Sequence, residues 1–270
     1  YQSPDSYLRG GLTEWRAKAR WQTLTNPYAR QIQRSLSTNL IGPRGIQMRA
    51  DVRLPAEERA NDDPTPREQP KDPVRCMEIE KAWKRFITAD CFDISGHRGF
   101  HQFELAIAES FPAAGGVLVR IHREAAGKSK SPICFELIPV DQLDEGFTRP
   151  SDIPGRHWRM GIEFDNRTGR RTRYAILRHH PGDNVAMRHP EPGDKYIFVP
   201  AADMLHIFIP EDVAQTRERP WLLSILTTIQ NINSYEEAHW TRKRAINNML
   251  GFIQKPEPDM PGSPDSTSGL

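Results

Sequence analysis

Two extended runs joined by a short polar turn place the strongest constraint on how this chain folds. They lie in MGIEFDNRTGRRTRYAIL, residues 160–177, on either side of the turn DNRTG at 165–169. Asp, Asn and Gly close tight turns between antiparallel strands, and glycine adopts positive φ without steric cost. The segment therefore predicts a β-hairpin, with Gly169 in a left-handed conformation.

Other strand and helix signals surround this hairpin. Helical patterns come first: one begins at Asn26-Pro27 and stops at Gly42, and two more cover 75–88 and 99–111. Strand patterns follow in GGVLVRIHRE, SPICFELIPVDQL and DKYIFVPAADMLHIFIP, the last broken near Pro200. A final helical stripe begins at Pro220 and is expected to reach about Ile253. Helices, then mostly antiparallel strands, then one long helix indicate an α+β fold instead of an alternating βαβ series.

Composition restricts the classes of function. With 37% apolar and 27% charged residues, the chain is polar, which predicts long exposed loops or surfaces that partners cover. The net charge of +2 argues against a protein that grips nucleic acid by neutralising phosphates, but permits one past which DNA slides. Three cysteines without C-x-x-C spacing indicate reduced thiols, and no run approaches the ~18 apolar residues of a membrane span.

Few residues suggest catalysis or metal binding. His97 and His101 are four apart, but the glycines between and before them make a continuous helix doubtful. Carboxylates cluster at Asp141, Asp144 and Glu145, and such clusters can hold Mg²⁺. An acidic turn that closes a strand is favoured, and a metal-dependent nuclease that uses these acids with a nearby His is kept as the alternative. We expect no cofactor.

The order of several motifs resembles the lambda-type phage portal proteins. NPYARQIQRSLSTNLIG, IEKAWKRFIT, HQFELAIAESF and the strand segments follow one another as in that family. The most specific segment, VPAADMLHIFIPEDVAQTRERPWLLSILTTIQNINSYEEA, is similar to the pattern VPA-x-D-x-x-H, Q-x-R-G-x-P and Y-x-x-A. Ten residues match: Val199, Pro200, Ala201, Asp203, His206, Gln215, Arg217, Pro220, Tyr235 and Ala238. Glu218 stands where the family usually has Gly, which raises a question about the local backbone.

The resemblance implies a structural subunit, not an enzyme, of a ring of twelve copies at one capsid vertex, through which double-stranded DNA passes. It implies as partners the major capsid protein, the large terminase subunit and head-completion proteins. The protein would lie in the virion, after assembly in the host cytoplasm. The implied organisation is a helical arm packed on the wing (1–50), a flexible polar loop (51–75), a wing domain (76–218), a long helix toward the stem (219–255) and a linker (256–270).

Residues in and after QTRERPW receive specific predictions. Gln215, Pro220 and Trp221 would form a hinge between strand and helix, with Trp221 anchoring the helix start against the sheet. Unpaired buried arginines are costly, so Arg217 and Arg219 should meet carboxylates, and we expect at least one of them to do so on a neighbouring subunit. Further along the helix, residues that could face DNA in the channel are Arg242, Lys243 and Arg244.

Overall fold

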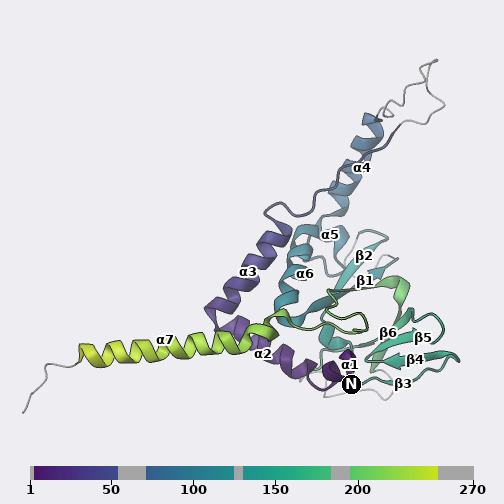
Figure 1. Ribbon diagram of the computed structural model, residues 1–270. Coiled ribbons are helices and arrows are strands. Elements are labelled where there is room, and N and C mark those ends of the chain that lie inside the picture. Colours follow the sequence, from purple (N-terminus) through teal and green to yellow (C-terminus); the bar gives the residue numbers. More distant parts are fainter. Residues whose placement is uncertain (1–2, 54–70, 125–129, 184–194, 249–270) are drawn as a thin grey trace, which may run out of the picture. The chain divides into compact units, whose positions relative to one another are not determined.

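A computed structural model of the chain describes residues 3–53, 71–124, 130–183 and 195–248 (Figure 1). It divides into two compact units, Tyr1–Leu226 and Thr227–Leu270, and each is considered by itself. The first unit contains helices and antiparallel strands, and the second contains most of the long helix α7 (Leu226–Asn247). The predicted α+β class is confirmed.

Helices open the first unit, and their ends follow capping rules. They are α1 (Pro4–Arg9), α2 (Leu12–Thr25), α3 (Pro27–Ile41), α4 (Pro73–Phe86), α5 (Ala89–Phe92) and α6 (Phe100–Ala114). The Asn26 side chain accepts hydrogen bonds from the first N–H groups of α3, and Asp72 does the same for α4. Proline follows each cap, where a missing N–H loses nothing. The helix predicted to begin at Asn26-Pro27 and to stop at Gly42 is thus confirmed.

The strands form two antiparallel sheets. The smaller has the order β2-β1-β8, from β1 (Gly116–His122), β2 (Cys134–Ile138) and β8 (Met204–Phe208). The larger has the order β3-β4-β5-β6-β7, from β3 (Arg149–Pro150), β4 (Arg156–Arg159), β5 (Ile162–Asp165), β6 (Arg171–Leu177) and β7 (Tyr196–Pro200). The break predicted near Pro200 is present, and it moves the chain from the larger sheet to the smaller one.

Two apolar cores hold these layers together. Between the sheets lies one formed from Leu118, Ile138, Ile162, Tyr174, Ile176, Val199, Met204 and their neighbours. On the other face of the smaller sheet, aromatic residues of α5 and α6 pack on Val119 and Phe135, with Phe92 at their centre. Helix α6 in turn lies beside α3, so α3 forms an outer layer on that side (Figure 1).

The polar loop predicted at 51–75 falls largely on residues 54–70, which are outside the described residues, as is the linker 256–270. The two described ends of that loop meet. Asp72 N–H donates to the Val52 carbonyl at 2.8 Å, and Arg53 pairs with Lys71 across an antiparallel bridge. Residues 51–53 and 71–72 therefore lie side by side.

We expect that replacing residues 54–70 by a short Gly-Ser turn leaves the melting temperature within about 2 °C. The paired ends already close the loop, and shortening a closed loop changes its entropy only slowly with length. Asp72 must be kept, because it caps α4. Thermal unfolding followed by circular dichroism checks this, and a large fall would show that 54–70 contributes to the core.

The β-hairpin predicted at residues 160–177 is confirmed. β5 and β6 pair antiparallel, and Gly169 lies between them with φ +66°. The Asp165 side chain accepts hydrogen bonds from the N–H groups of Arg167 and Thr168, which fixes the turn. Positive φ therefore explains the glycine, since no atom lies near the position that a Cβ would take there.

Gly169→Val should lower the free energy of unfolding by about 1 kcal/mol or more, because a β-branched residue resists positive φ. Gly169→Asn is the matched control, since asparagine tolerates this conformation. Urea denaturation of both variants measures the difference. Equal midpoints for the two variants would show that strain at this position is not what selects glycine.

The long helix starts later than the sequence suggested. Pro220 precedes a 3₁₀ helix at Trp221–Ile225, and α-helical geometry begins only at Leu226. The prediction that Pro220 opens the α-helix is therefore wrong. Within the second unit, α7 is described as far as Asn247, and its predicted continuation to Ile253 lies beyond the described residues. No helix among the described residues is long and apolar enough to cross a membrane.

A buried charged junction as the candidate functional site

The segment QTRERPW, residues 215–221, connects the end of β8 with the turn before α7, and it lies within the first unit. Gln215 closes its entry: the side-chain oxygen accepts the Glu211 N–H at 2.8 Å, and the side-chain nitrogen donates to the Arg217 carbonyl at 2.7 Å. Three successive side chains, Thr216 to Glu218, then point into the protein and are buried. The segment is thus an internal connection.

Arg217 is enclosed by its own subunit. Its guanidinium donates to the carbonyl oxygens of Leu143 and Met160, both at 2.9 Å, and to that of Val140 at 3.1 Å. The same group pairs with Glu218 at 3.1 Å, and the side chain has 0% exposure. These contacts join QTRERPW to the turn after β2 and to the start of β5, and they leave Arg217 no surface for a neighbouring subunit. The prediction that placed Arg217 at a subunit contact is corrected here.

Glu218 is the anion at the centre of this cluster. Its carboxylate accepts hydrogen bonds from Arg16 of α2 and from Arg217, and the side chain is fully buried. Asp141, after β2, lies 3.8 Å from Arg16 and also pairs with Arg20. We call the set Arg16, Asp141, Arg171, His206, Arg217 and Glu218 the charged junction.

His206 of β8 is the sixth member of the charged junction, and its imidazole is neutral. Arg171 Nη1 lies 3.2 Å from its Nδ1, and its Nε2 lies 2.7 Å from Glu218 Oε2. Arginine can only donate, so Nδ1 must accept, and the imidazole proton is therefore on Nε2 and is donated to Glu218. This tautomer satisfies both nitrogens without adding a positive charge.

Neighbouring side chains decide which groups of the charged junction are ionised. Burial alone would favour the neutral acid at Glu218, but Arg217 and Arg16 outweigh it and hold the pKa of that carboxyl well below its usual range. At His206, burial lowers the pKa, and this exceeds the opposite effect of the Glu218 carboxylate. Near neutral pH, three arginines therefore face two carboxylates and one neutral histidine.

A second contact attaches the first helix to the same segment. Asp5 of α1 accepts the Thr216 N–H at 2.8 Å and the Thr216 hydroxyl, and it lies 3.3 Å from Arg159 of β4. Nearby, Leu12 of α2 packs with Met160 in a small apolar cluster. Helix α1 is therefore bound to Thr216 by hydrogen bonds, and α2 is bound to Glu218 by an ion pair. Apolar contacts with Met160 attach both helices to the loop between β4 and β5.

Two further residues of QTRERPW, Arg219 and Trp221, have different surroundings. Arg219 pairs with Glu211 at the surface, about one third exposed, so its role at a subunit contact stays a prediction. Trp221 stacks on Phe111 of α6, with ring centroids 5.1 Å apart. Trp221 thus attaches the start of the helix to α6, and its predicted packing against the sheet stays a prediction.

Gly115 and Gly116, between α6 and β1, make room for this segment. A Cβ on Gly115, where φ is +88°, would overlap the backbone of Arg219, and a Cβ on Gly116 would lie 3.3 Å from that of Glu218. The glycine pair therefore does more than turn the chain, since it lets residues 218 and 219 approach the end of α6.

Gly115→Ala should lower the free energy of unfolding by about 1–3 kcal/mol, because it adds backbone strain and an overlap that only movement of Arg219 can relieve. Gly155→Ala is the control: φ is also positive there, at +80°, but no atom lies near its Cβ position. The difference between the two variants in urea denaturation isolates the close approach. If both lose the same amount, the overlap has no role.

The acids of the nuclease alternative are engaged in structural contacts. Asp141 belongs to the charged junction, Asp144 accepts the Gly146 N–H at 2.9 Å and the Tyr196 hydroxyl, and Glu145 accepts the Thr13 hydroxyl at 2.6 Å. The described residues contain no group of three or more His, Cys, Asp or Glu placed to hold a metal ion. No observation supports the alternative.

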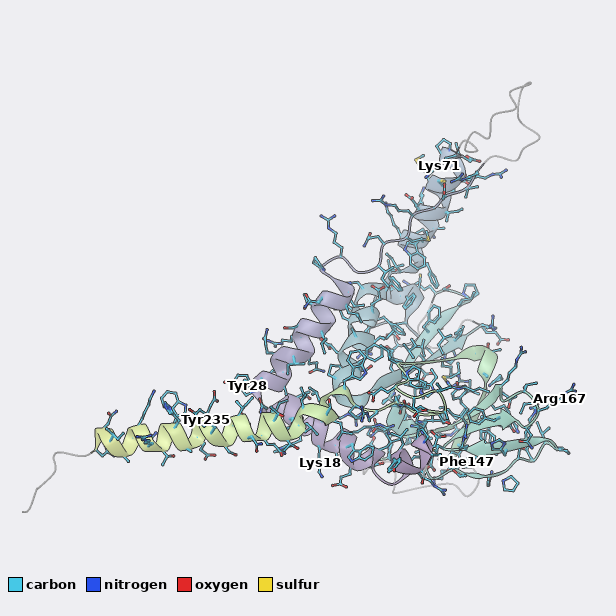
Figure 2. All side chains as sticks on the ribbon, in the orientation of Figure 1. Lys18, Tyr28, Lys71, Phe147, Arg167 and Tyr235 are labelled. Carbon is cyan, nitrogen blue, oxygen red and sulfur yellow. The ribbon has the colours of Figure 1, made fainter. Side chains whose placement is uncertain are left out.

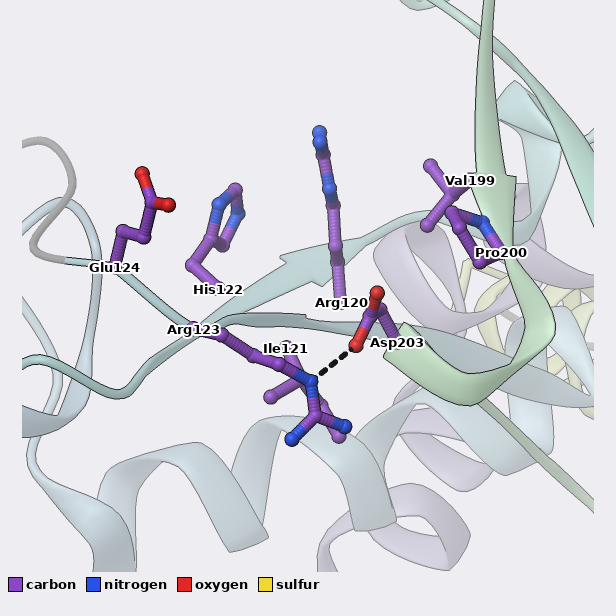
Figure 3. A pocket seen from close by; sticks show the side chains of 8 residues that line it. All are labelled: Arg120, Ile121, His122, Arg123, Glu124, Val199, Pro200 and Asp203. Carbon is purple, nitrogen blue, oxygen red and sulfur yellow. Dashed lines mark hydrogen bonds and ion pairs between the residues drawn. The ribbon is translucent and has the colours of Figure 1, made fainter.

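An open pocket of about 340 Å³ lies where β1 leaves the smaller sheet, next to the turn between β7 and β8 (Figure 3). Side chains alternate along the strand there, with Arg120 and His122 on one side and Arg123 on the other. His122 Nε2 lies 2.8 Å from Glu136, and Arg123 Nε lies 2.6 Å from Asp203. His122 and Arg123 are thus paired within the chain, which makes the pocket a weaker candidate than the charged junction.

Comparison with known proteins agrees with this architecture. The model of the family described as "Phage portal protein, lambda family" matches residues 1–269. A protein named "Probable portal protein", from Halomonas phage phiHAP-1, is 28% identical over 254 residues, which cover 93% of this chain and 45% of that protein. The chain thus spans less than half the length of this relative. Since the family match extends over nearly all of the sequence, the chain belongs to the lambda family of phage portal proteins.

Proposed function

We propose that the protein is a structural subunit of a portal ring at one vertex of a phage capsid, through which double-stranded DNA enters and leaves. The family match over residues 1–269 carries this proposal. The ring would contain twelve copies and would contact the major capsid protein, the large terminase subunit and head-completion proteins. The protein would act in the virion without an enzymatic activity of its own.

The side chains of α7 support assembly with other copies. Large apolar residues on this helix are solvent-exposed: Ile232 by 40%, Tyr235 by 71%, Trp240 by 60% and Ile246 by 54%. In proteins most of the stability of a helix comes from packing of its apolar side chains against other elements. We propose that α7 leads toward the stem of the ring, where neighbouring copies of the helix cover these residues.

The basic end of α7 is the part proposed to face DNA. Arg242, Lys243 and Arg244 are exposed, and Lys243 Nζ lies 5.4 Å from the centre of the Trp240 ring. Three exposed cations on a helix attract phosphates without reading sequence, as a channel for passing DNA requires. Arg219 remains the residue proposed for the contact between adjacent subunits.

Electron microscopy of the purified full-length protein tests the proposal. Rings with a central channel are expected, and incubation with plasmid DNA and Mg²⁺ should leave the DNA intact. A protein that stays monomeric at all concentrations, or that cuts DNA in a metal-dependent way, would contradict it. Replacing Arg219 by Ala should weaken rings without unfolding the subunit.

A further inference from the structure

The first 50 residues carry a charge unlike that of the rest of the chain. Lys and Arg together number eight in this segment, whereas Asp and Glu together number two. The segment therefore has an excess of six positive charges in a chain whose net charge is +2. The other residues are therefore net negative by four. No acidic residue occurs between Glu14 and Asp51. Such asymmetry is typical of chains that bind a polyanion with one part of their surface.

Only part of this positive charge is used inside the subunit. Arg16 and Arg20 pair with Glu218 and Asp141, and Lys18 pairs with Glu14 at 2.6 Å on α2. Arg9 of α1 is exposed and has no carboxylate partner among the residues that the structure describes, and the same holds for four further arginines: Arg30, Arg34, Arg44 and Arg49. Two of them are on α3, and the other two lie in the segment that follows it.

Helix α3 presents its two arginines side by side. Arg30 and Arg34 are four residues apart and so lie on one face, about 6 Å apart along the axis. Gln31 and Thr38 share that face and are also exposed. Glu109 of α6 is near the edge of this face, where its carbonyl accepts a hydrogen bond from Gln33, but its carboxylate pairs with neither arginine. We call Arg30, Gln31, Arg34 and Thr38 the α3 basic face.

The chemistry of this face favours a phosphate backbone over a protein partner. Stable protein interfaces have an apolar centre, usually with aromatic anchors, and are depleted of charge there. The α3 basic face contains only hydrogen-bond donors or neutral polar groups, and the exposed leucines of α3, Leu36 and Leu40, project from other sides of the helix. Arg, Gln and Thr are residues that commonly contact phosphate oxygens.

We propose that the α3 basic face binds the phosphate backbone of double-stranded DNA without sequence preference, at a place distinct from the basic end of α7. The site depends on the first unit alone and not on ring formation. Because phosphate contacts release counterions, binding should be weak at physiological salt, with Kd of about 10⁻⁴–10⁻⁶ M, and should tighten as salt falls.

The test compares two double substitutions with the same change of charge. Arg30→Glu with Arg34→Glu removes the α3 basic face. Arg167→Glu with Arg170→Glu makes the same change at the β5–β6 hairpin, where Arg167 lies on the opposite side of the unit from Tyr28 at the start of α3 (Figure 2). The binding of a fluorescent 30-base-pair duplex is measured by anisotropy between 50 and 200 mM salt, with circular dichroism as a folding control.

We expect the α3 variant to bind at least tenfold more weakly, with the slope of log K against log salt reduced by about 2, since each lost phosphate contact removes about 0.9. The hairpin variant should bind within twofold of the unchanged protein. The proposal would be overturned by equal losses of DNA binding in both variants or by the absence of binding by the unchanged protein at 50 mM salt. It would also be overturned if poly-glutamate competed more strongly than DNA. Arg30→Gln with Arg34→Gln gives the same comparison if the glutamate variant does not fold.

Ring formation separates this inference from the proposed function. The α3 variant should form rings like those of the unchanged protein in electron microscopy. Loss of rings with DNA binding retained would assign the α3 basic face to a subunit contact and would contradict DNA binding there. Absence of rings in the unchanged protein would contradict the portal proposal but would leave the duplex measurement interpretable.

Discussion

Glu218→Ala is expected to lower the free energy of unfolding by about 3–5 kcal/mol. The substitution removes the carboxylate shared by Arg16, Arg217 and His206 and leaves two guanidinium groups buried beside each other. A buried charge that loses its partner keeps its desolvation penalty without the attraction that offset it. Glu218→Gly should be at least as destabilising, because the same cations remain buried.

The matched control for this prediction is Glu211→Ala. Glu211 also pairs with an arginine of the same segment, Arg219, but both side chains are partly exposed. Exposed pairs contribute only about 0–1 kcal/mol because water replaces the lost partner. Urea denaturation of both variants should show a large shift for Glu218→Ala alone. Similar small shifts would mean that the charged junction is not a source of stability.

The second large effect is a loss of stability in mild acid. In the native protein, burial lowers the pKa of His206 and so opposes its protonation. In the unfolded chain, the same histidine binds a proton near the ordinary pKa of about 6.5. The unfolded state therefore binds more protons below pH 6.5, and stability must fall as the pH decreases. The slope of this loss cannot exceed about 1.4 kcal/mol per pH unit, so His206 contributes at most about 2 kcal/mol between pH 7 and pH 5.

Other groups add to this loss only at lower pH. Glu218 has a pKa well below its usual range, and the pKa of Glu163 is lowered to about 2, mainly by its hydrogen bond from Arg173. Both carboxylates therefore stabilise the folded protein at neutral pH, and this contribution is lost as the pH falls below about 4.5. The control for the upper window is His206→Gln, which keeps a donor toward Glu218 but does not titrate. Its unfolding free energy should be flatter between pH 7 and pH 5. An unchanged slope in this variant would exclude His206 as the cause.

Local rules were sufficient for most of the secondary structure. Asn26-Pro27 and Gly42 bounded a helix correctly, and DNRTG identified a hairpin turn, because capping and positive φ depend on neighbouring residues only. The start of α7 was misjudged for a related reason. Pro220 fits the first turn of any helix, and nothing local distinguishes the 3₁₀ turn that lets Trp221 reach Phe111.

The charged junction could not be predicted from the sequence, because its members are far apart in the chain. Arg16 and Glu218 are separated by 202 residues, and only the tertiary fold brings them together. One signal was present: a buried arginine requires a carboxylate, and Glu218 lies next to Arg217 in the sequence. The sequence correctly required a partner for Arg217, but it could not show that the partner was the adjacent residue.

The measurement that tests this account most directly compares Arg217→Ala with Arg219→Ala, each in the full-length protein. Both the unfolding free energy of the subunit and ring formation in electron microscopy are recorded. Arg217→Ala should destabilise the subunit by about 3–5 kcal/mol, because three carbonyl groups lose a buried donor and Glu218 loses one of its buried cations. Arg219→Ala should instead leave a stable subunit with weaker rings. A normally stable Arg217→Ala subunit that has lost only its rings would contradict the account.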